Sequence, residues 1–283
     1  MNYSDTPANT EELHIRPYGL LEKNTIEPQQ IELVHSPDSI AFFFSVLPTK
    51  DFDFDPFAAA FFILSRYEEY LPFKADRHGR FSSVESSLYH PRFLFVPIID
   101  HWVIWIKQKL KALFPFLLLQ QSKFNFQATY DIDLAWAYLH RNGWRTIGGL
   151  LQDAKLPNRD QLQARWRVLT RKSKDPFDTY SLLASHTSPE PIYFFLLGDY
   201  GKYDKNIAPS SFALQQLIRK VAQRAEVGIH PSYRANSSFN QLEKEVRRLE
   251  HLIGKPVTAS RQHFFKIDFP RYLQEFSANR YLA

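Results

Sequence analysis

Residues 124–133, FNFQATYDID, form the stretch that decides the fold. Apolar and polar residues alternate through its first part, which predicts a β-strand, and this strand ends in the acids Asp131 and Asp133. Residues 134–143, LAWAYLHRNG, predict a helix that ends at Gly143. A strand that carries acids at its carboxyl end and leads into a helix is the unit from which parallel α/β sheets are built.

The alternation of strand and helix continues toward the C-terminus. Short apolar runs predict strands at 191–200, 225–229 and 255–260. Helical spacing of apolar residues predicts helices at 210–225 and 238–254, and a further helix beginning at Pro270. Helices and loops rich in basic residues are expected over 144–185. This order of elements predicts the α/β class, with a parallel sheet.

The segment before this sheet contains two helices with extensive apolar surfaces. DPFAAAFFILSRYEEYLP (55–72) predicts a buried helix that Asp55 caps, with Pro56 in its first turn, and this helix is expected to run to Leu71. Residues 98–114 predict the second helix. Both carry more apolar surface than a single solvent-facing layer needs, so we expect them to form a separate core.

Length and composition fit two domains. The chain has 283 residues, of which 44% are hydrophobic and 23% are charged, so it has enough apolar surface for two modest cores. Short strands and loops are expected over residues 1–50. We therefore expect a smaller α+β N-terminal domain of unknown role at 1–120, followed by the α/β domain at 121–283.

The amino-acid content excludes several classes of chemistry and of location. The chain has no cysteine, so a metal must be held by His, Asp or Glu, and a cysteine nucleophile is excluded. The first residues, MNYSDTPANTEEL, are polar and acidic, unlike a secretion signal. No apolar run is long enough to span a membrane. We expect a cytoplasmic protein without a transmembrane segment.

The net charge of +5 is unevenly distributed, because basic residues cluster between residues 141 and 174. One interpretation is a solvated connecting region. The other is a surface for anionic glycans, lipid-linked sugar phosphates or nucleic acid. No nucleic-acid-binding motif accompanies the charge, so a nucleic-acid partner is not expected.

Side chains that bind metals or carry charge follow three of the expected strands. They are Asp131 and Asp133, then His230, then Arg261 and His263. Because parallel α/β barrels place their active sites at the carboxyl ends of the strands, we expect these side chains to meet at one rim. Asp133 with two histidines is a zinc-type ligand set with an open position for water.

Each of these residues also has a simpler explanation. The two acids could cap the following helix, or form the DxD group with which glycosyltransferases bind a nucleotide-sugar metal. A lone His230 or His263 is more often a structural hydrogen-bonding residue than a ligand. Arg261 could steer a carboxylate or pair with one at the surface. The agreement of three strand ends favours the metal site.

At these motifs the sequence resembles a known family. TYDID, EVGIHPSY and SRQHFF, in this order, resemble the polysaccharide deacetylases (NodB homology, carbohydrate esterase family 4). DPFAAAFFILSRYEEY, DRHGRFS and VPIIDHW resemble the N-terminal domain of the bacterial branch of that family. The resemblance implies a distorted (β/α) barrel and a metal-dependent hydrolase that removes acetyl groups from a glycan in bacterial polysaccharide metabolism.

The resemblance also implies a role for each motif residue. Asp131 matches the catalytic base and Arg261 the arginine that orients it. Asp133 and His230 match metal ligands, although Ile132 separates two acids that are adjacent in the better-known pattern. Arg234 stands where that pattern has its second metal histidine, and His263 is our substitute ligand. The metal is expected to be divalent, with zinc first.

The family pattern continues beyond the strands found here and supplies a late histidine as general acid. Residues 124–283 are fewer than the ~200 of the smallest complete barrels, so we expect a partial barrel that binds a divalent metal weakly and has little or no deacetylase activity. A partner or a second copy would then cover its open edge. The alternatives are a truncated, non-catalytic relative that binds glycan or protein, and a DxD glycosyltransferase.

Overall fold

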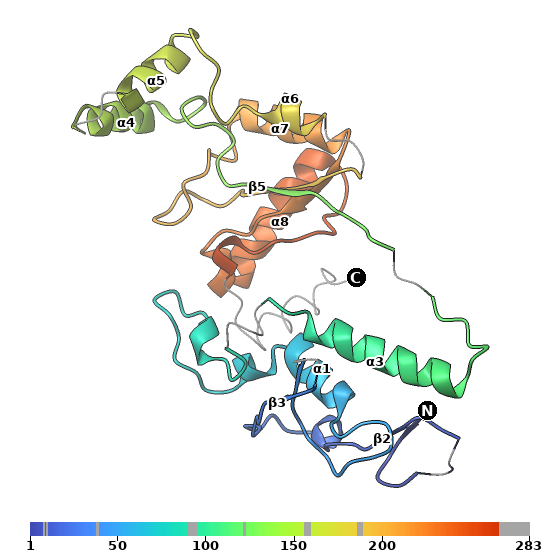
Figure 1. The fold of residues 1–283 in the computed structure, drawn as a ribbon. Coiled ribbons are helices and arrows are strands. Elements are labelled where there is room, and N and C mark those ends of the chain that lie inside the picture. Colours follow the sequence, from blue (N-terminus) through green and yellow to red (C-terminus); the bar gives the residue numbers. More distant parts are fainter. Residues whose placement is uncertain are drawn as a thin grey trace. The chain divides into compact units, whose positions relative to one another are not determined.

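The computed structural model describes residues 1–7, 9, 11–37, 40–89, 95–120, 123–155, 160–185 and 189–265. The chain is a mixed α/β protein that divides into two compact units, Met1–Lys123 and Phe124–Ala283 (Figure 1). The division at 123/124 lies close to the expected boundary at 120/121. Each unit is described by itself. The helix expected at Pro270 lies outside the described residues.

The N-terminal unit combines two short strand pairs with two α-helices. β1 and β2 pair in parallel, whereas β3 and β4 are antiparallel. Its elements in chain order are β1 (Asn2–Tyr3), β2 (His14–Ile15), η1 (Leu20–Glu22), β3 (Val34–His35), β4 (Ala41–Phe42), α1 (Pro56–Leu64), η2 (Tyr67–Tyr70), η3 (Ser83–Glu85) and α3 (Ile98–Leu113). This mixture agrees with the expected α+β character.

Helix α1 begins as expected but ends early. The Asp55 side chain accepts hydrogen bonds from the backbone N–H groups of Phe57 and Ala58, and Pro56 occupies the first helical position. The helix ends at Leu64 instead of Leu71, because Arg66 takes a left-handed conformation with φ 55° and a 3₁₀ turn, η2, follows. The expectation of one continuous helix to Leu71 was wrong.

Aromatic rings fill the core of the N-terminal unit. Phe43, Phe54 and Trp102 are each almost fully buried, and their rings meet edge to face. The Trp102 indole N–H donates to the Ala41 carbonyl over 3.0 Å, so its one polar group is satisfied. Much of the chain's high aromatic content therefore serves this core.

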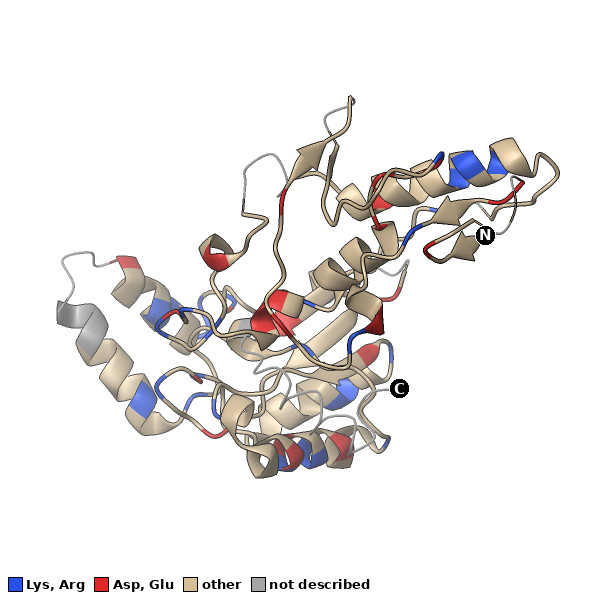
Figure 2. Ribbon diagram, turned by 90° about the horizontal axis from the view of Figure 1, so that it is seen from below, with Lys and Arg blue, Asp and Glu red and all other residues tan. Residues whose placement is uncertain are grey.

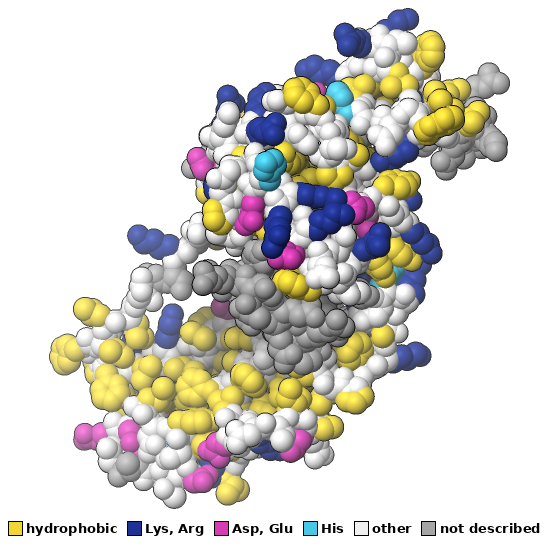
Figure 3. All heavy atoms as spheres, turned by 180° about the vertical axis from the view of Figure 1, so that it is seen from behind, with side chains coloured by type: hydrophobic (Ala, Val, Ile, Leu, Met, Phe, Trp, Pro, Cys, Tyr) yellow, Lys and Arg dark blue, Asp and Glu magenta, His cyan; other side chains and the backbone are white. Residues whose placement is uncertain are grey.

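The same unit also exposes large apolar side chains, among them Leu64 on α1, and Figure 3 shows hydrophobic side chains over much of one face.

The C-terminal unit is built on a parallel sheet with strand order β5-β6-β7. Its elements in chain order are β5 (Thr129–Ile132), α4 (Gly143–Lys155), α5 (Asp160–Leu169), α6 (Tyr180–Leu183), β6 (Ile192–Phe195), α7 (Phe212–Ala222), β7 (Glu226–Ile229), η4 (Ala235–Ser237), α8 (Phe239–Ile253) and η5 (His263–Phe265). The expected fourth strand is reduced to a single parallel bridge between Ile229 and Ser260. Within the described residues the sheet is open.

The two faces of this sheet differ. Tyr193, Phe195, Val227 and Ile229 face one side, where they form one core cluster with apolar residues of α7 and α8. Because side chains alternate along a strand, Asp131, Phe194 and Gly228, which are level with one another in the register, face the other side. One face is therefore a packed core, and the other carries the polar residues at the strand ends.

Residues 134–142 do not form the expected helix, and Gly143 begins helix α4 instead of ending a helix. The buried carboxylate of Asp175 explains the difference. It accepts the backbone N–H groups of Ala137, Tyr138 and Leu139, at 2.8, 2.8 and 3.1 Å. These donors are thereby satisfied without helical hydrogen bonds. β5 also starts only at Thr129, and Phe124 and Phe126 before it are exposed.

The basic segment expected at 141–174 forms helices α4 and α5, and both carry basic positions (Figure 2). Two of its arginines are built into the unit. Arg145 donates to the carbonyls of Lys205 and Asn206, and Arg165 is buried with its guanidinium over the Tyr138 ring. Among the described residues, no helix has the length and apolar character needed to cross a membrane.

Candidate functional site

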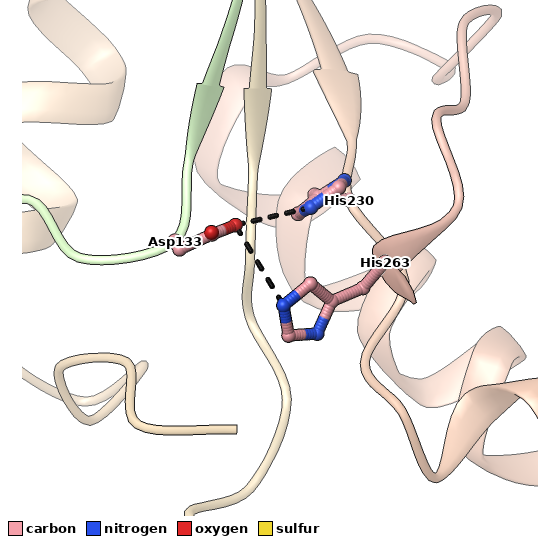
Figure 4. A group of neighbouring side chains, drawn as sticks. All are labelled: Asp133, His230 and His263. Carbon is pink, nitrogen blue, oxygen red and sulfur yellow. Dashed lines mark ion pairs between the residues drawn. The ribbon is translucent and has the colours of Figure 1, made fainter. Parts of the chain in front are cut away.

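Asp133, His230 and His263 come together beyond the carboxyl ends of the strands (Figure 4). Asp133 follows β5, His230 follows β7 directly, and His263 begins η5. Asp133 Oδ1 lies 3.0 Å from His230 Nε2 and 4.0 Å from His263 Nε2. One ligand atom from each residue can be chosen so that all lie within 4.8 Å of one another. The sequence analysis predicted that Asp133, His230 and His263 meet at one rim of the sheet, and in the structure they do.

The strand register explains this convergence. Ile132, Phe195 and Ile229 are level across β5, β6 and β7, so Asp133 and His230 are the next residues of the two outer strands. Ile229 N–H donates to Ala259 O, and Arg261 N–H donates to Ile229 O, each over 3.0 Å. This pairing holds the segment before His263 against β7. Parallel strands therefore bring together residues that are far apart in sequence.

His230 is buried at 4% exposure and has both ring nitrogens engaged. Its Nδ1 makes a short hydrogen bond to the backbone carbonyl of Arg261, and because a carbonyl only accepts, Nδ1 carries the proton. Its Nε2 faces Asp133, a side chain that is 56% exposed. A hydrogen bond from His230 lowers the pKa of the Asp133 carboxyl, against the opposing effect of burial, and this bond uses a second ring proton on Nε2 that a bound cation would displace. The carboxylate therefore stays ionised beside the imidazole.

His263 is also buried, and a carboxylate lies on the far side of its ring. Asp204 Oδ1 is 3.1 Å from His263 Nδ1 and also accepts the backbone N–H of Tyr233 over 2.8 Å. Asp204 itself is only 1% exposed. The backbone N–H of His263 donates to Pro231 O over 3.3 Å. The Nε2 atoms of His230 and His263 are thus both on the Asp133 side of their rings.

Asp131 and Arg261 form a pair next to this cluster. Arg261 Nη1 lies 3.2 Å from Asp131 Oδ1, and the guanidinium passes over the Phe194 ring at 5.0 Å. A Cβ on Gly228 would lie 2.6 Å from the Phe194 ring and 2.7 Å from Ala259 O. Because Gly228 has no side chain, the Phe194 ring can lie against it. The Arg261 guanidinium lies over this ring and reaches Asp131.

A cavity of about 630 Å³ lies beside strand β5. Its wall includes both acids, Asp131 and Asp133, together with Phe177 from the segment that leads into α6 and Tyr180, the first residue of α6. Phe177 is half exposed. A small ligand in this cavity would touch both carboxylates and an aromatic face.

Two residues of this region were missed by the sequence analysis. Asp204 lies in the loop between β6 and α7, and Asp175 lies between α5 and α6, so neither follows a strand directly. The sequence GDYGKYDKN around Asp204 contains no recognisable spacing. Its only signal was its position in a loop that follows a strand of the same sheet. Arg234, which stands where the family pattern has a histidine, is exposed and caps η4.

Comparison with known proteins concerns the N-terminal unit. A family model described as a family of unknown function (DUF7033) matches residues 1–115. No curated protein and no solved structure matches the chain. The match ends before β5, so the function of the C-terminal unit has to be argued from its geometry.

Proposed function

We propose that the C-terminal unit is a divalent-metal-dependent hydrolase that removes acetyl groups from a carbohydrate, with the architecture of a partial polysaccharide deacetylase barrel. One observation carries the proposal. The ligand atoms of Asp133, His230 and His263 lie within 4.8 Å of one another, beside the Asp131–Arg261 pair. A metal-ligand set and a separate oriented carboxylate are the two parts that metal-assisted hydrolysis requires.

The donor set fits a zinc-type cation. Two imidazole nitrogens and one carboxylate oxygen are ligands that Zn²⁺ accepts, and three protein ligands leave a position for water or substrate. Nδ1 of His230 is held by the Arg261 carbonyl, so Nε2 is the nitrogen that remains for a cation. Asp133 and Asp204, the two carboxylates that contact these imidazoles, bring two negative charges, which a divalent cation would balance.

The chain's own residues would divide the chemistry between them. A divalent cation, when bound, polarises an acyl carbonyl and makes water a nucleophile near neutral pH. Asp131 would take up the proton of the attacking water, because its carboxylate is not one of the clustered ligands. The guanidinium of Arg261, 3.2 Å away, offers Asp131 a charge-assisted hydrogen bond and fixes the direction of its oxygens.

The cavity beside β5 supports a carbohydrate as the substrate. A volume of about 630 Å³ is of the size that small-ligand sites have, and it is open to both carboxylates. The half-exposed ring of Phe177 offers an apolar face against which a sugar ring can pack. Four basic side chains are exposed at the end of α5 and just after it, and they favour a glycan that carries negative charge: Arg167, Arg171, Lys172 and Lys174.

Metal binding by the full chain is the first test. We expect Zn²⁺ and Co²⁺ to bind in calorimetric titrations, and we expect His230→Ala and His263→Ala each to reduce the affinity at least ~100-fold. His251→Ala is the matched control, since His251 is exposed on α8 and lies outside the cluster. Equal affinities for wild type, His230→Ala and His251→Ala would show an ordinary ion-pair network in place of a metal centre.

Acetate release is the second test. Acetylated chito-oligosaccharides and acetyl esters are incubated with the metal-loaded chain, and acetate is measured directly. Asp131→Asn should keep the metal affinity of the wild type and lower the rate ~10²–10⁴-fold, the usual contribution of a general base. A chain that binds metal but releases no acetate from either substrate class would refute the deacetylase activity.

A further inference from the structure

The buried carboxylate of Asp204 is the least explained charged group near the metal cluster. It is 1% exposed and lies in the loop that joins β6 to α7. Burying a carboxylate is costly unless hydrogen-bond donors surround it. The backbone N–H of Tyr233 is one donor, at 2.8 Å from Oδ1. The same oxygen faces His263 Nδ1 at 3.1 Å, so the imidazole is part of what compensates the burial.

We propose that Asp204 is a positioning residue that fixes the tautomer and the orientation of His263. A carboxylate only accepts hydrogen bonds, so His263 must carry its proton on Nδ1. Nε2 then has a free lone pair and points to Asp133 Oδ1, 4.0 Å away. Carboxylate–histidine pairs of this kind orient metal ligands and raise their basicity. The use of this orientation for a metal rests on the proposed function, whereas the tautomer itself does not.

The loop that carries Asp204 is anchored from several sides. Arg145 of α4 donates to the carbonyls of Asn206 and Lys205, at 2.8 and 2.6 Å, and its guanidinium stacks on Tyr200 at 4.2 Å. The Asn206 side chain donates to Gly198 O over 2.7 Å. Asp204 is therefore held by contacts on both sides of it in sequence, and one of them comes from a helix of the basic segment.

Aromatic rings enclose the Asp204–His263 contact. Tyr203 and Tyr233 pack at 4.3 Å between ring centroids, and Phe264 meets both of them. Phe264 also lies 4.6 Å from the His263 ring. An enclosed hydrogen bond is stronger than one in water, and its geometry is better defined. The surroundings of His263 thus support one fixed orientation of its ring.

The tautomer can be measured without metal or activity. Long-range ¹H–¹⁵N spectra of the full metal-free chain at pH 8 should show His263 with its proton on Nδ1. Oδ1 of Asp204 contacts both Tyr233 N–H and His263 Nδ1, so an Asn that keeps its amide oxygen there would still accept from Nδ1, and Asp204→Ala is the variant that removes the acceptor. We expect Asp204→Ala to move the proton of His263 to Nε2. Asp199→Ala, in the same loop, is the matched control and should leave His263 unchanged.

The second readout is the affinity for Co²⁺. Asp204→Ala should bind Co²⁺ ~10–100-fold more weakly than wild type, with Asp199→Ala unchanged. If Asp204→Ala fails to fold, as judged by circular dichroism, Arg145→Ala provides the second variant. This change loosens the anchored loop without removing the carboxylate, and it should give a mixture of His263 tautomers.

The outcomes separate the two proposals. A His263 tautomer that is the same in Asp204→Ala and wild type would overturn the role of Asp204, whatever the metal result. A changed tautomer with unchanged Co²⁺ affinity would show that His263 is not a metal ligand, and the positioning role would then serve some other function of His263. A wild-type chain that binds no Co²⁺ would contradict the proposed function, while the tautomer still decides the role of Asp204.

Discussion

Asp55 in the N-terminal unit and Asp204 in the C-terminal unit are both buried aspartates, but their partners differ. Asp55 is fully buried, and its oxygens accept from three backbone N–H groups, of Tyr18, Phe57 and Ala58, and from the Tyr3 hydroxyl. Asp204 has one backbone donor, and its other contact is an imidazole. A buried carboxylate surrounded by backbone donors holds the chain together, whereas one that faces a histidine controls a side chain.

The buried histidines show the same contrast. His14 of the N-terminal unit has its ring Nε2 2.8 Å from the carbonyl of Ser4, a neighbouring backbone group. His230 and His263 instead share Asp133 at the strand ends. In the N-terminal unit, His14 and Asp55 thus contact mainly backbone groups of that unit, whereas in the C-terminal unit His230 and His263 both face the Asp133 side chain.

The largest effect is expected from Asp55→Ala. It leaves four buried or partly buried donors without their acceptor, and it removes the cap of α1. We expect a loss of ~4 kcal/mol in the unfolding free energy of the N-terminal unit. Hydrogen exchange of peptides from 41–64 should accelerate strongly. If Asp55 serves only the structure of the N-terminal unit, the affinity of the variant for Co²⁺ stays at the wild-type value. A large loss of Co²⁺ affinity would contradict this distinction between Asp55 and Asp204.

Gly198→Ala tests the packing beneath the site in the C-terminal unit. A Cβ at this position would overlap the Ser232 Cβ and lie 3.0 Å from its hydroxyl oxygen. Ser232 in turn donates both its N–H and its hydroxyl to the buried Glu245. We expect a loss of ~2–3 kcal/mol in urea unfolding. Gly201→Ala is the control, because its nearest contact would be an ordinary 3.7 Å.

Asp175→Asn sharpens the comparison, because Asp175 is a structural carboxylate of the Asp55 kind in the unit that carries the site. Burial acts to raise the pKa of Asp175, but hydrogen bonds from the backbone N–H groups of Tyr138, Ala137, Phe177 and Leu139 outweigh it and lower the pKa. An acid with a lowered pKa stabilises the folded state above its unfolded pKa, and this contribution is lost as the pH falls.

The expected cost of Asp175→Asn is therefore ~2 kcal/mol at pH 7, and it should start to decrease below about pH 4, where the unfolded wild-type chain takes up a proton at this aspartate before the folded chain does. Denaturant titrations of both chains from pH 7 to pH 3 measure the difference. Asp178→Asn, at an exposed position nearby, should show neither effect. A cost that is constant over this pH range would contradict the assignment of an ionised Asp175.

The smallest effect is expected at Gly254, which ends helix α8 with φ 70° and donates its N–H to Glu250 O. Gly254→Ala places a Cβ in the left-handed region, although no atom lies near enough to clash. We expect a cost of ~1 kcal/mol, measured as a lower midpoint in thermal unfolding. The metal affinity should not change, because Gly254 is not one of the clustered residues.

Local signals in the sequence were sufficient where one short segment decides the structure. Asp55 and Pro56 predicted the start of α1 correctly, and Gly254 predicted the end of α8. The position of Asp133 and His230 could also be predicted, because parallel strands all end at the same edge. These inferences needed only nearest neighbours or a general property of parallel sheets.

Distant partners decided the features that the sequence analysis missed. The LAWAYLHRNG segment has helical spacing, but Asp175, far along the chain, satisfies its N–H groups in another conformation. The early end of α1 depends on the left-handed backbone at Arg66. Asp204 belongs to a loop whose position is set by Arg145. No periodicity or spacing in a single segment reports such contacts.

The separation of the site residues along the chain has a consequence for folding kinetics. Asp131 and Arg261 are 130 residues apart in sequence, so their contact closes a long loop and depends on the assembled sheet. A collapsed intermediate with its helices formed would still lack the cluster. A cation that binds only the completed cluster should therefore slow unfolding and leave the refolding rate nearly unchanged. At a concentration of ~100 times its dissociation constant, it would add ~2.7 kcal/mol to the stability of the folded chain.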